Sequence, residues 1–559
     1  MVLEQTTHSN PMGLDTKQAT EHDKNTADVF RKISEAWSHQ PEERTLFQAI
    51  LAAAKMYGQD KTVVDDPERN TLTYKRLILA SLILGRQLAR GTQPGEAVGV
   101  LLPNVTGLVV TLVGLNANGR VPALLNFTAG PRNIVSAVHT APTSRVVTSR
   151  RFVETAKLSN IIDALEAAPL ADGRKIQIIY LEDVRAKIGI AAKALGFIRS
   201  MRAAQFHRST GMRPNKPAAV LFTSGTEGAP KGVVLSNRNL VGNSQQIISH
   251  ADGYLSSEDT VLNPLPMFHS FGLTAGTLMP LTQGMRVVLY PSPLHYKQIP
   301  KLIRQKQATV LFATDTFLQG YARAADPDDL ASVRFVVAGA ERVKDTTRQL
   351  WQELGTDIQE GYGATECAPV IACNLPPINT PGSVGPFLPG IEYRLEPVEG
   401  IREGGRLFIR GPNVMLGYLY ADAPGVVVPP EDGWHDTGDI VDVTDGKVII
   451  KGRAKRFAKI GGEMVSLAAI EALAATLWPE AQHVVVNIPD PKKGEQLILV
   501  TDKPDAERRA LADFARDKGF PELWIPKALM VVGAIPVLGS GKIDFPATTK
   551  MVQQARPLL

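Results

Sequence analysis

Cysteine is scarce in this sequence, and its scarcity limits the kinds of site that the chain can build. The 559 residues include only Cys367 and Cys373, and no histidine lies near either thiol. Two cysteines six residues apart with no histidine nearby therefore imply neither a disulfide framework nor a zinc site. Reduced thiols are typical of cytosolic proteins. The polar, charged first 25 residues have no signal-peptide pattern, which also favours a cytoplasmic location.

A strong charge imbalance and an unbroken apolar run are also missing. The formal net charge is +5, which suits acidic partners or an anionic membrane surface but is too weak to predict nucleic-acid binding. Residues 97–119 carry no charge and are long enough to span a membrane, yet Pro103, Asn104 and Asn116 interrupt the run. We therefore expect a strand, a turn and a buried helix there, with a membrane span as the alternative.

Length and hydrophobic spacing predict the architecture. A chain of 559 residues is too long for a single core, and it contains no internal repeat. Strand and helix patterns alternate through most of the chain, which indicates an α/β fold of parallel sheets covered by helices. Prolines and glycines multiply from residue 381, where we expect a β-rich lobe. Residues 1–27 are polar enough to be disordered or loosely attached.

One glycine-rich segment, LFTSGTEGAPKGVVLSNRNL (221–240), stands out chemically. An apolar strand ends near Phe222, a second is expected over 232–235, and the turn between them is rich in hydroxyls and glycines. Glycine lets the backbone approach a ligand, while hydroxyl and N–H groups donate to anionic oxygens. Lys231 adds a positive charge behind Pro230. The segment predicts a polyphosphate cradle, formed by Thr223, Ser224, Gly225, Thr226, Glu227 and Gly228.

Spacing distinguishes this cradle from the common P-loop. A P-loop requires G-x-x-x-x-G-K followed by Ser or Thr and a helix. Here Pro230 stands where the second glycine would be, and Gly232 follows Lys231. An ordinary hairpin turn between two strands is the alternative interpretation.

A second unusual segment, residues 183–208, has apolar residues at helical spacing. Six Lys or Arg residues follow Asp183 with no further acidic residue. A basic amphipathic helix binds a membrane surface or an acidic partner. A surface helix with a solvated basic face is the alternative. Peripheral contact with the inner face of the membrane is therefore an open prediction for this segment.

Four further side chains complete the set that nucleotide-dependent activation of a carboxylic acid requires. Glu366, in a glycine-spaced loop, offers an oxygen ligand to a divalent metal. Asp439 offers a carboxylate to a ribose diol, and Tyr362 offers an aromatic face to adenine. When a carboxylate attacks the α-phosphorus, like charges approach each other, and a cation such as Lys542 must neutralise them. Each residue alone has an ordinary structural explanation, so only the whole set supports the hypothesis.

Several motifs occur in the order found in one protein family. SGTEGAPKG, PMFHSFG, VAGAE, GYGATE, WHDTGD, GRAKRFAKIGGEMVS and GSGKID resemble the motifs of the acyl-adenylate-forming (AMP-binding) superfamily, from about residue 30 to the C-terminus. The resemblance implies a large N-terminal domain, 28–452, a hinge, 453–456, and a small mobile α+β domain, 457–559. It also implies two half-reactions. ATP and a carboxylate give an acyl-adenylate and pyrophosphate, and a thiol then takes the acyl group and releases AMP.

The same resemblance implies roles for individual residues. The cradle and Lys231 would hold the pyrophosphate. Catalytic roles would fall to Lys542, His269 and Lys231, Mg²⁺ binding to Glu366 and Thr226, and the hinge to Lys455. Beyond the cradle, the nucleotide contacts would come from Gly339, Ala340, Glu341, Gly361, Tyr362, Gly363, Thr365, Asp439 and Arg453.

The segments GAERV, EGYGATECAPV, YPSPLHY and PVLGSGKIDF are most similar to one branch of the superfamily. That branch is the acyl–acyl-carrier-protein synthetase half of bifunctional 2-acylglycerophosphoethanolamine acyltransferases, whose acyltransferase domain has no counterpart here. The leading hypothesis is an ATP- and Mg²⁺-dependent ligase that passes a long-chain fatty acid to the phosphopantetheine thiol of acyl carrier protein. CoA as the acceptor is the runner-up. A catalytically silent nucleotide or acyl-lipid binding protein is the alternative of another class.

Overall fold

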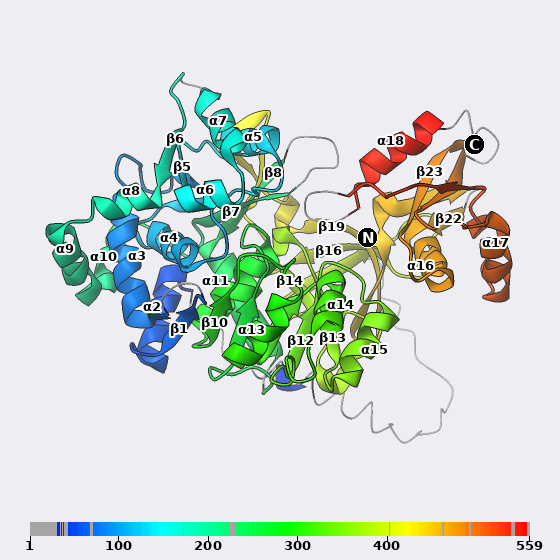
Figure 1. Cartoon of the computed structure of the whole chain (residues 1–559), viewed down its shortest axis with the longest axis horizontal. Coiled ribbons are helices and arrows are strands. Elements are labelled where there is room, and N and C mark those ends of the chain that lie inside the picture. The colour runs from blue at the N-terminus through cyan, green and yellow to red at the C-terminus, as the bar shows by residue number, and fades with distance from the viewer. Residues whose placement is uncertain are drawn as a thin grey trace, which may run out of the picture.

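A computed structural model describes most of the chain (Figure 1). The described residues are 43–67, 71–170, 173–223, 230–251, 253–401, 403–460, 463–490, 494–537 and 543–555, together with 29, 31–33, 35 and 37. Three predictions lie outside them: the loosely attached segment 1–27, residues 224–228 of the cradle, and Lys542.

The large domain is built on two eight-stranded sheets, and the first has the order β14-β13-β12-β11-β9-β10-β1-β2. Its six central strands run parallel to their neighbours, and β14 and β2 at the edges run antiparallel. The strands are β1 (Thr62–Asp65), β2 (Leu72–Thr73), β9 (Thr260–Asn263), β10 (Arg286–Leu289), β11 (Val310–Ala313), β12 (Phe335–Ala338), β13 (Ile358–Gly363) and β14 (Val370–Cys373).

The second sheet has the order β18-β17-β8-β7-β4-β3-β5-β6, and its last five strands are parallel. β7 and β8 are antiparallel neighbours, so the loop that carries the predicted cradle closes a hairpin. The strands are β3 (Ala97–Val100), β4 (Val121–Leu124), β5 (Arg145–Thr148), β6 (Gln177–Tyr180), β7 (Pro217–Thr223), β8 (Lys231–Ser236), β17 (Gly417–Tyr420) and β18 (Ala423–Val428).

Helices pack around both sheets (Figure 1). Local sequence sets where some of them begin. In α2 the Thr45 hydroxyl accepts from the N–H of Gln48, whose side chain accepts from the N–H of Thr45, and this capping box satisfies two free backbone donors. The helices are α2 (Leu46–Tyr57), α3 (Tyr74–Leu88), α4 (Thr106–Ala117), α5 (Pro131–Thr140), α6 (Arg150–Thr155), α7 (Ser159–Ala167), α11 (Asn237–His250), α12 (Met279–Thr282), α13 (Gln298–Lys306), α14 (Asp315–Ala324) and α15 (Asp345–Glu353).

The uncharged run 97–119 is strand β3, a turn and helix α4, as predicted. Every residue of α4 from Leu108 to Ala117 is buried. The helix lies inside the protein, which explains why its sequence has no charged face. Among the residues that the structure describes, no helix is long and apolar enough to cross a membrane.

The basic segment 183–208 is not one helix, and that prediction is wrong. It forms α8 (Leu181–Ala186), α9 (Ile190–Met201) and α10 (Ala203–Ser209). Gly189 has an extended backbone between the first two, and Arg202 leaves the helical conformation between the second and third. Glycine is a poor helix former, which explains the first break.

A β-rich lobe and a small C-terminal part complete the chain. The lobe is an antiparallel sheet of β15 (Glu392–Glu396), β16 (Gly405–Arg410), β19 (His435–Thr444) and β20 (Lys447–Arg453). Asp445 and Gly446 both have positive φ, so they form the tight hairpin turn that the sequence predicts. The C-terminal part contains β21 (Phe457–Ile460), β22 (Glu463–Ser466), α16 (Leu467–Leu477), β23 (His483–Asp490), β24 (Gly494–Thr501), α17 (Arg508–Asp517), β25 (Ala528–Val531) and α18 (Phe545–Ala555).

The predicted α/β class, with parallel sheets, a β-rich lobe and a small α+β C-terminal part, is confirmed. Two apolar clusters of the C-terminal part draw only on residues from 458 onward. Its mobility and the limits 28–452, 453–456 and 457–559 stay predictions.

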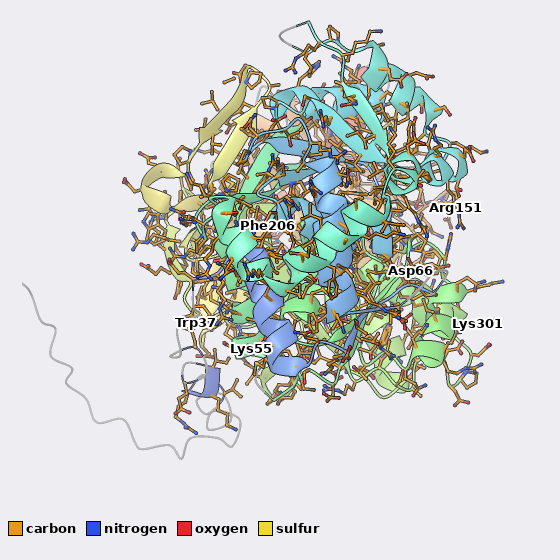
Figure 2. The ribbon with its side chains drawn as sticks, turned by 90° about the vertical axis from the view of Figure 1, so that its left-hand side faces the viewer. Trp37, Lys55, Asp66, Arg151, Phe206 and Lys301 are labelled. Carbon is orange, nitrogen blue, oxygen red and sulfur yellow. The ribbon has the colours of Figure 1, made fainter. Side chains whose placement is uncertain are left out.

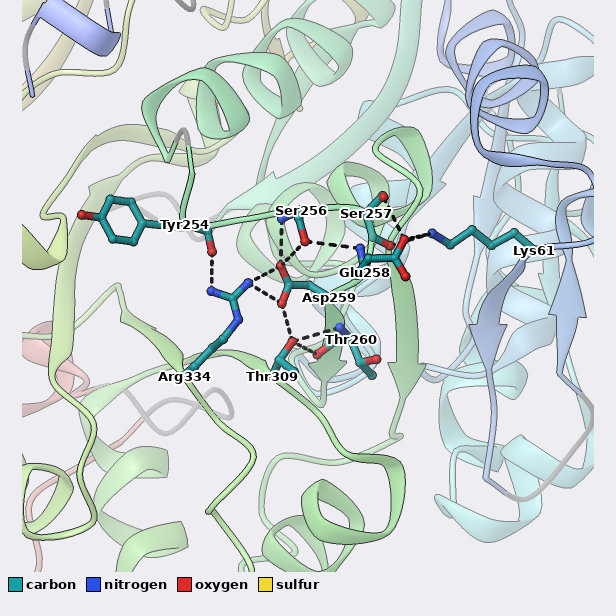
Figure 3. A network of polar contacts seen from close by, with 9 residues as sticks. All are labelled: Lys61, Tyr254, Ser256, Ser257, Glu258, Asp259, Thr260, Thr309 and Arg334. Carbon is teal, nitrogen blue, oxygen red and sulfur yellow. Dashed lines mark hydrogen bonds and ion pairs between the residues drawn. The ribbon is translucent and has the colours of Figure 1, made fainter.

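A buried carboxylate ties together the amino ends of three strands of the first sheet (Figure 3). Asp259, only 3% exposed, precedes β9, while Thr309 and Arg334 precede β11 and β12. Its carboxylate accepts from Arg334 Nη2 at 2.5 and 2.6 Å, from Thr309 Oγ1 at 2.6 Å and from the N–H of Ser256 at 2.8 Å. A buried charge with this many donors fixes the strand starts relative to one another.

Candidate active site

A cavity of about 2450 Å³ lies at the carboxyl ends of the parallel strands. Its wall includes residues from the loops after β3, β4, β5 and β7 of one sheet and after β9, β10, β11, β12 and β13 of the other. Ligands of α/β proteins bind at this end of the strands, where the loops converge. The topology therefore brings segments that are far apart in the sequence to one site.

Eleven of the predicted site residues line this cavity. They are Thr223, His269, Gly339, Ala340, Glu341, Gly361, Tyr362, Gly363, Thr365, Glu366 and Arg453. Lys231 and Asp439 are not among the lining residues, but Lys231 follows Pro230, which lines the cavity, and Asp439 contacts Tyr362 and Arg453, which also do. Lys455 lies in the turn Ala454–Arg456 between β20 and β21.

The turn after β12 forms part of the wall. Ala340 has a positive φ of 68°, which residues with a side chain rarely adopt. The carboxylate of Glu341 accepts from the N–H and the hydroxyl of Thr316 at 3.1 and 2.9 Å, so it holds the start of α14. Strained turns of this kind occur preferentially at ligand sites.

Tyr362, Asp439 and Arg453 form a connected group on the same wall. The Tyr362 hydroxyl donates to Asp439 Oδ2, and Arg453 Nε lies 3.0 Å from Asp439 Oδ1. Burial raises the pKa of Asp439, while the charge of Arg453 and the hydrogen bond from Tyr362 oppose that rise. Burial, together with the charge of Asp439, also raises the pKa of Tyr362, so the phenol stays a neutral donor. Asp439 thus orients the two residues that face the cavity.

Glu366 links the two sheets at the cavity wall. It lies in the 3-10 turn Thr365–Cys367 after β13, and its Oε1 accepts from the hydroxyl of Tyr418 on β17 at 2.7 Å. Lys231 Nζ lies 5.3 Å from the ring centres of both Tyr418 and Tyr420, within the range of cation–π attraction. Neither tyrosine stands out in the sequence, because their spacing is that of an ordinary strand, and only the pairing of β17 with β8 brings them to Lys231.

The donors at this end fit a magnesium–nucleotide complex. Within the described part of the chain, no group of three or more His, Cys, Asp or Glu could hold a metal ion. Mg²⁺ at nucleotide sites is held by one or two carboxylates, with phosphate oxygens and water completing the coordination. A single carboxylate such as Glu366 at the wall suits that arrangement. The second predicted ligand, Thr226, lies outside the described residues.

His269 borders a rare element. It is exposed to the cavity and packs against Phe268, with 4.6 Å between the ring centres. The next residues, Phe271–Leu278, form a π-helix, η1, and such helices occur frequently at functional sites. Between them, Ser270 Oγ lies 3.5 Å from the Thr365 hydroxyl, which connects this segment to the turn that carries Glu366.

Another part of the wall is apolar and comes from helices. None of its residues stands out in the sequence, because apolar side chains that line a cavity have the same helical spacing as those of a core. From α3, α4 and α9 the cavity is lined by Leu79, Ala80, Ile83, Leu84, Gly107, Val110 and Phe197, among others. One cavity therefore combines a polar end with an apolar wall.

Comparison with known proteins identifies the family. The sequence model of the AMP-binding enzyme family matches residues 51–419, about two thirds of the chain. This chain belongs to the AMP-binding enzyme family. This match and the similarity to CoA ligases confirm the predicted superfamily and the predicted enzyme class, an AMP-forming acid–thiol ligase.

Two curated relatives illustrate the sequence similarity of this AMP-binding enzyme. A Rhodococcus jostii propanoyl:CoA ligase, whose acyl group carries a 7a-methyl-1,5-dioxo-octahydro-1H-inden-4-yl substituent, is 29% identical over 518 residues, covering 89% of this chain and 96% of the relative. A long-chain-fatty-acid–CoA ligase of Yersinia pestis is 26% identical over 492 residues, covering 83% of this chain and 86% of the relative.

Solved structures share the fold of this AMP-binding enzyme. MatB from Rhodopseudomonas palustris with ATP bound has a TM-score of 0.73 and 22% identity, covering 91% of this chain and 99% of MatB. The anthranilate CoA ligase AuaEII in complex with anthranoyl-AMP has a TM-score of 0.74 and 20% identity, covering 93% of this chain and 99% of that protein.

Proposed function

We propose that this protein activates a long-chain fatty acid with ATP through an acyl-adenylate and then transfers the acyl group to the thiol of CoA. The observation that carries the proposal is the continuity of one cavity. Its wall includes Tyr362, Thr365 and Glu366 as well as the apolar residues of α3 and α4. A nucleotide fits the first group, an acyl chain fits the second, and the carboxyl group of the acid would lie where the two meet.

The first half-reaction forms the adenylate. A carboxylate oxygen of the acid attacks the α-phosphorus of ATP, the bond from that phosphorus to the pyrophosphate oxygen breaks, and pyrophosphate leaves. Lys231 and the cradle, 223–228, hold the leaving group, and Lys542 neutralises the charge that gathers as the two anions approach. Glu366 and Thr226 would hold Mg²⁺, which supplies positive charge to the phosphate oxygens.

The remaining residues position the nucleotide and the acyl group. The turn 339–341 and Tyr362 frame adenine, Asp439 and Arg453 bind the ribose, Thr365 contacts the α-phosphate and His269 borders the acyl group. In the second half-reaction the deprotonated thiol attacks the acyl carbon, the bond to the phosphate oxygen breaks, and AMP leaves. Rotation of the small C-terminal part about Lys455 would withdraw Lys542 between the two steps.

Two acceptors suit the chemistry of the second half-reaction. The Rhodococcus and Yersinia relatives are CoA ligases, which supports CoA. Acyl carrier protein is the second candidate, because GAERV, EGYGATECAPV and PVLGSGKIDF resemble acyl-carrier-protein synthetases. Both acceptors present a phosphopantetheine thiol, so the same chemistry serves either one.

A labelling assay tests the proposal. The protein is incubated with radiolabelled palmitate, ATP, Mg²⁺ and either CoA or holo-acyl carrier protein. Label in acyl-CoA supports the proposal, whereas label in the carrier protein alone favours the second candidate. Absence of pyrophosphate exchange across a panel of fatty acids would leave the silent binding protein as the explanation.

Substitution of Lys542 separates the half-reactions. Lys542→Ala should abolish adenylate formation and leave thioester formation from supplied acyl-AMP intact. The matched control, Lys550→Ala, removes an exposed lysine of α18 and should leave both rates unchanged. Equal loss of both half-reactions in Lys542→Ala contradicts the assigned role.

A further inference from the structure

One end of the molecule presents an uncovered apolar surface. Thirteen large hydrophobic side chains are exposed among the described residues, and four of them lie on α9: Ile190 (86% exposed), Phe197 (53%), Ile198 (54%) and Met201 (65%). In Figure 1, α9 lies at one end of the long axis, opposite the C-terminal part, and that end faces the viewer in Figure 2. A cluster of exposed apolar side chains marks an interaction site.

Close packing fixes which side of α9 faces outward. A Cβ atom at Gly196 would come within 2.2 Å of Ile83, so the helix lies directly against α3 and only glycine fits at that point. The guanidinium of Arg199 stacks 4.3 Å from the ring centre of Phe206 and joins α9 to α10. Because the inner side is fixed in this way, the four apolar side chains cannot turn inward without unpacking the helix.

Positive charge surrounds these side chains. Residues 184–216 contain eight Lys or Arg residues and no Asp or Glu. Four cations on α9 and its flanks are exposed, and none of them forms an ion pair within the described structure: Lys187, Lys193, Arg202 and Arg208. Strand β18 also exposes three valines, 426–428, but it carries no Lys or Arg. Of these two exposed surfaces, only the one at α9 therefore combines apolar with cationic side chains.

The same helix also borders the cavity. Lys193, Ala194 and Phe197 line the space that contains Glu366 and Thr365 at its polar end. Phe197 is 53% exposed and is part of the cavity wall. The helix that carries the exposed apolar side chains therefore also forms part of the cavity wall.

We propose that the α9 surface, made of the four apolar and four cationic side chains named above, docks on a bilayer that contains anionic phospholipid. A bilayer with anionic headgroups accommodates both kinds of side chain at once. The apolar ones enter the boundary between headgroups and acyl chains, and the cations meet the anionic headgroups. We further propose that the fatty acid passes from the bilayer into the cavity along α9, a step that rests on the proposed function.

Vesicle sedimentation tests the docking directly. The full-length protein is mixed with vesicles of phosphatidylcholine alone or of phosphatidylcholine with about one third phosphatidylglycerol. We expect binding to the anionic vesicles, weaker binding in high salt because the charges are screened, and little binding to phosphatidylcholine alone. Binding that is equal for both vesicles and insensitive to salt overturns the proposal.

Two variants separate the apolar and the electrostatic parts. Ile190→Ser/Met201→Ser should lower the vesicle partition coefficient about tenfold. Lys187→Gln/Arg202→Gln/Arg208→Gln should lower it on the order of 100-fold, because each cation near an anionic surface contributes about fivefold. The matched controls, Val426→Ser/Val531→Ser and Lys301→Gln/Arg509→Gln/Lys518→Gln, change exposed side chains elsewhere and should bind like the parent.

Activity measurements then test the route. With a soluble short-chain acid, the apolar variant should adenylate at the parental rate, because neither Ile190 nor Met201 lines the cavity. With palmitate embedded in anionic vesicles, its rate should fall about as much as its binding does. An unchanged rate on embedded palmitate overturns the route.

The readouts distinguish the two proposals. If the protein sediments with anionic vesicles but activates no fatty acid, the proposed function fails while the docking stands. If the patch variants bind vesicles like the parent and lose only acyl transfer to a carrier protein, the surface docks an acidic protein and the membrane proposal is overturned.

Discussion

The two ends of the parallel sheets carry similar chemical groups in opposite arrangements. At the amino ends, Asp259 is buried and accepts hydrogen bonds from Arg334, Thr309 and Ser256. At the carboxyl ends, Glu366 accepts from Tyr418 and lines the cavity. The first carboxylate is satisfied within the fold, whereas the second also faces the cavity.

This difference shows where stability and function are located. Carbonyl groups and loops at the carboxyl ends converge on a space that the helices leave open, so polar groups there can serve a ligand. At the amino ends the same kinds of groups are used to hold strand starts together. Substitutions at the two ends should therefore have opposite consequences for stability and for activity.

The largest effect is expected at the amino end. Asp259→Ala leaves the Arg334 guanidinium without its carboxylate and the Thr309 hydroxyl without its acceptor. We expect the free energy of unfolding to fall by about 3 to 5 kcal/mol, measured by urea denaturation, with adenylation at low temperature unchanged. Asp328→Asn, at an exposed position, is the control and should behave like the parent. Loss of activity without loss of stability would show that Asp259 serves activity and not stability, the opposite of what we expect.

The next effect concerns the carboxyl end. Glu366→Gln removes the carboxylate that we propose as the Mg²⁺ ligand. We expect adenylate formation, measured by pyrophosphate exchange, to fall about 100- to 1000-fold, with the denaturation midpoint nearly unchanged. Glu154→Gln, an exposed substitution elsewhere, should retain full exchange. A variant that exchanges normally would exclude Glu366 from the site.

A third prediction uses pH to probe the part of the fold that lies away from the cavity. Burial lowers the pKa of His250 to about 4, and its Nε2–H donates to the carbonyl of Cys373 at 2.8 Å. Its Nδ1 is buried and has no partner, so a second proton would be unsatisfied. The unfolded state binds that proton more tightly, so stability should decrease as pH falls from 6.5 toward 4, by about 3 kcal/mol in total.

Denaturation at a series of pH values measures this effect. His250→Gln keeps a donor for the Cys373 carbonyl and cannot titrate, so its stability should vary less over the same range. An equally steep loss of stability in His250→Gln would show that another group is responsible.

The smallest effect is expected at Tyr362. Tyr362→Phe removes one donor to the Asp439 carboxylate, which raises the pKa of Asp439 further because burial already raises it. We expect kcat/KM to fall about fivefold and the acid limb of its pH profile to move to higher pH. An unshifted acid limb would show that protonation of Asp439 does not control activity at low pH.

Local patterns predicted much of the fold. The strand, turn and buried helix over 97–119, the hairpin at Asp445-Gly446 and the parallel sheets all follow from the spacing of apolar and turn residues. The single helix over 183–208 was wrong, because the break at Gly189 outweighed the helical spacing of the residues around it. Residues 224–228 and Lys542 remain predictions from the motifs alone.

The sequence by itself determined the chemical groups available to this AMP-binding enzyme and the order in which they occur. Elements and turns depend on neighbouring residues, so they can be predicted from short stretches. Only the tertiary structure decided that Tyr418 meets Glu366, that α9 borders the cavity, and that Asp259 joins three strands. Those contacts join residues that are far apart in the chain. They depend on which strands pair and which helices pack together, and the packing of the whole fold determines both.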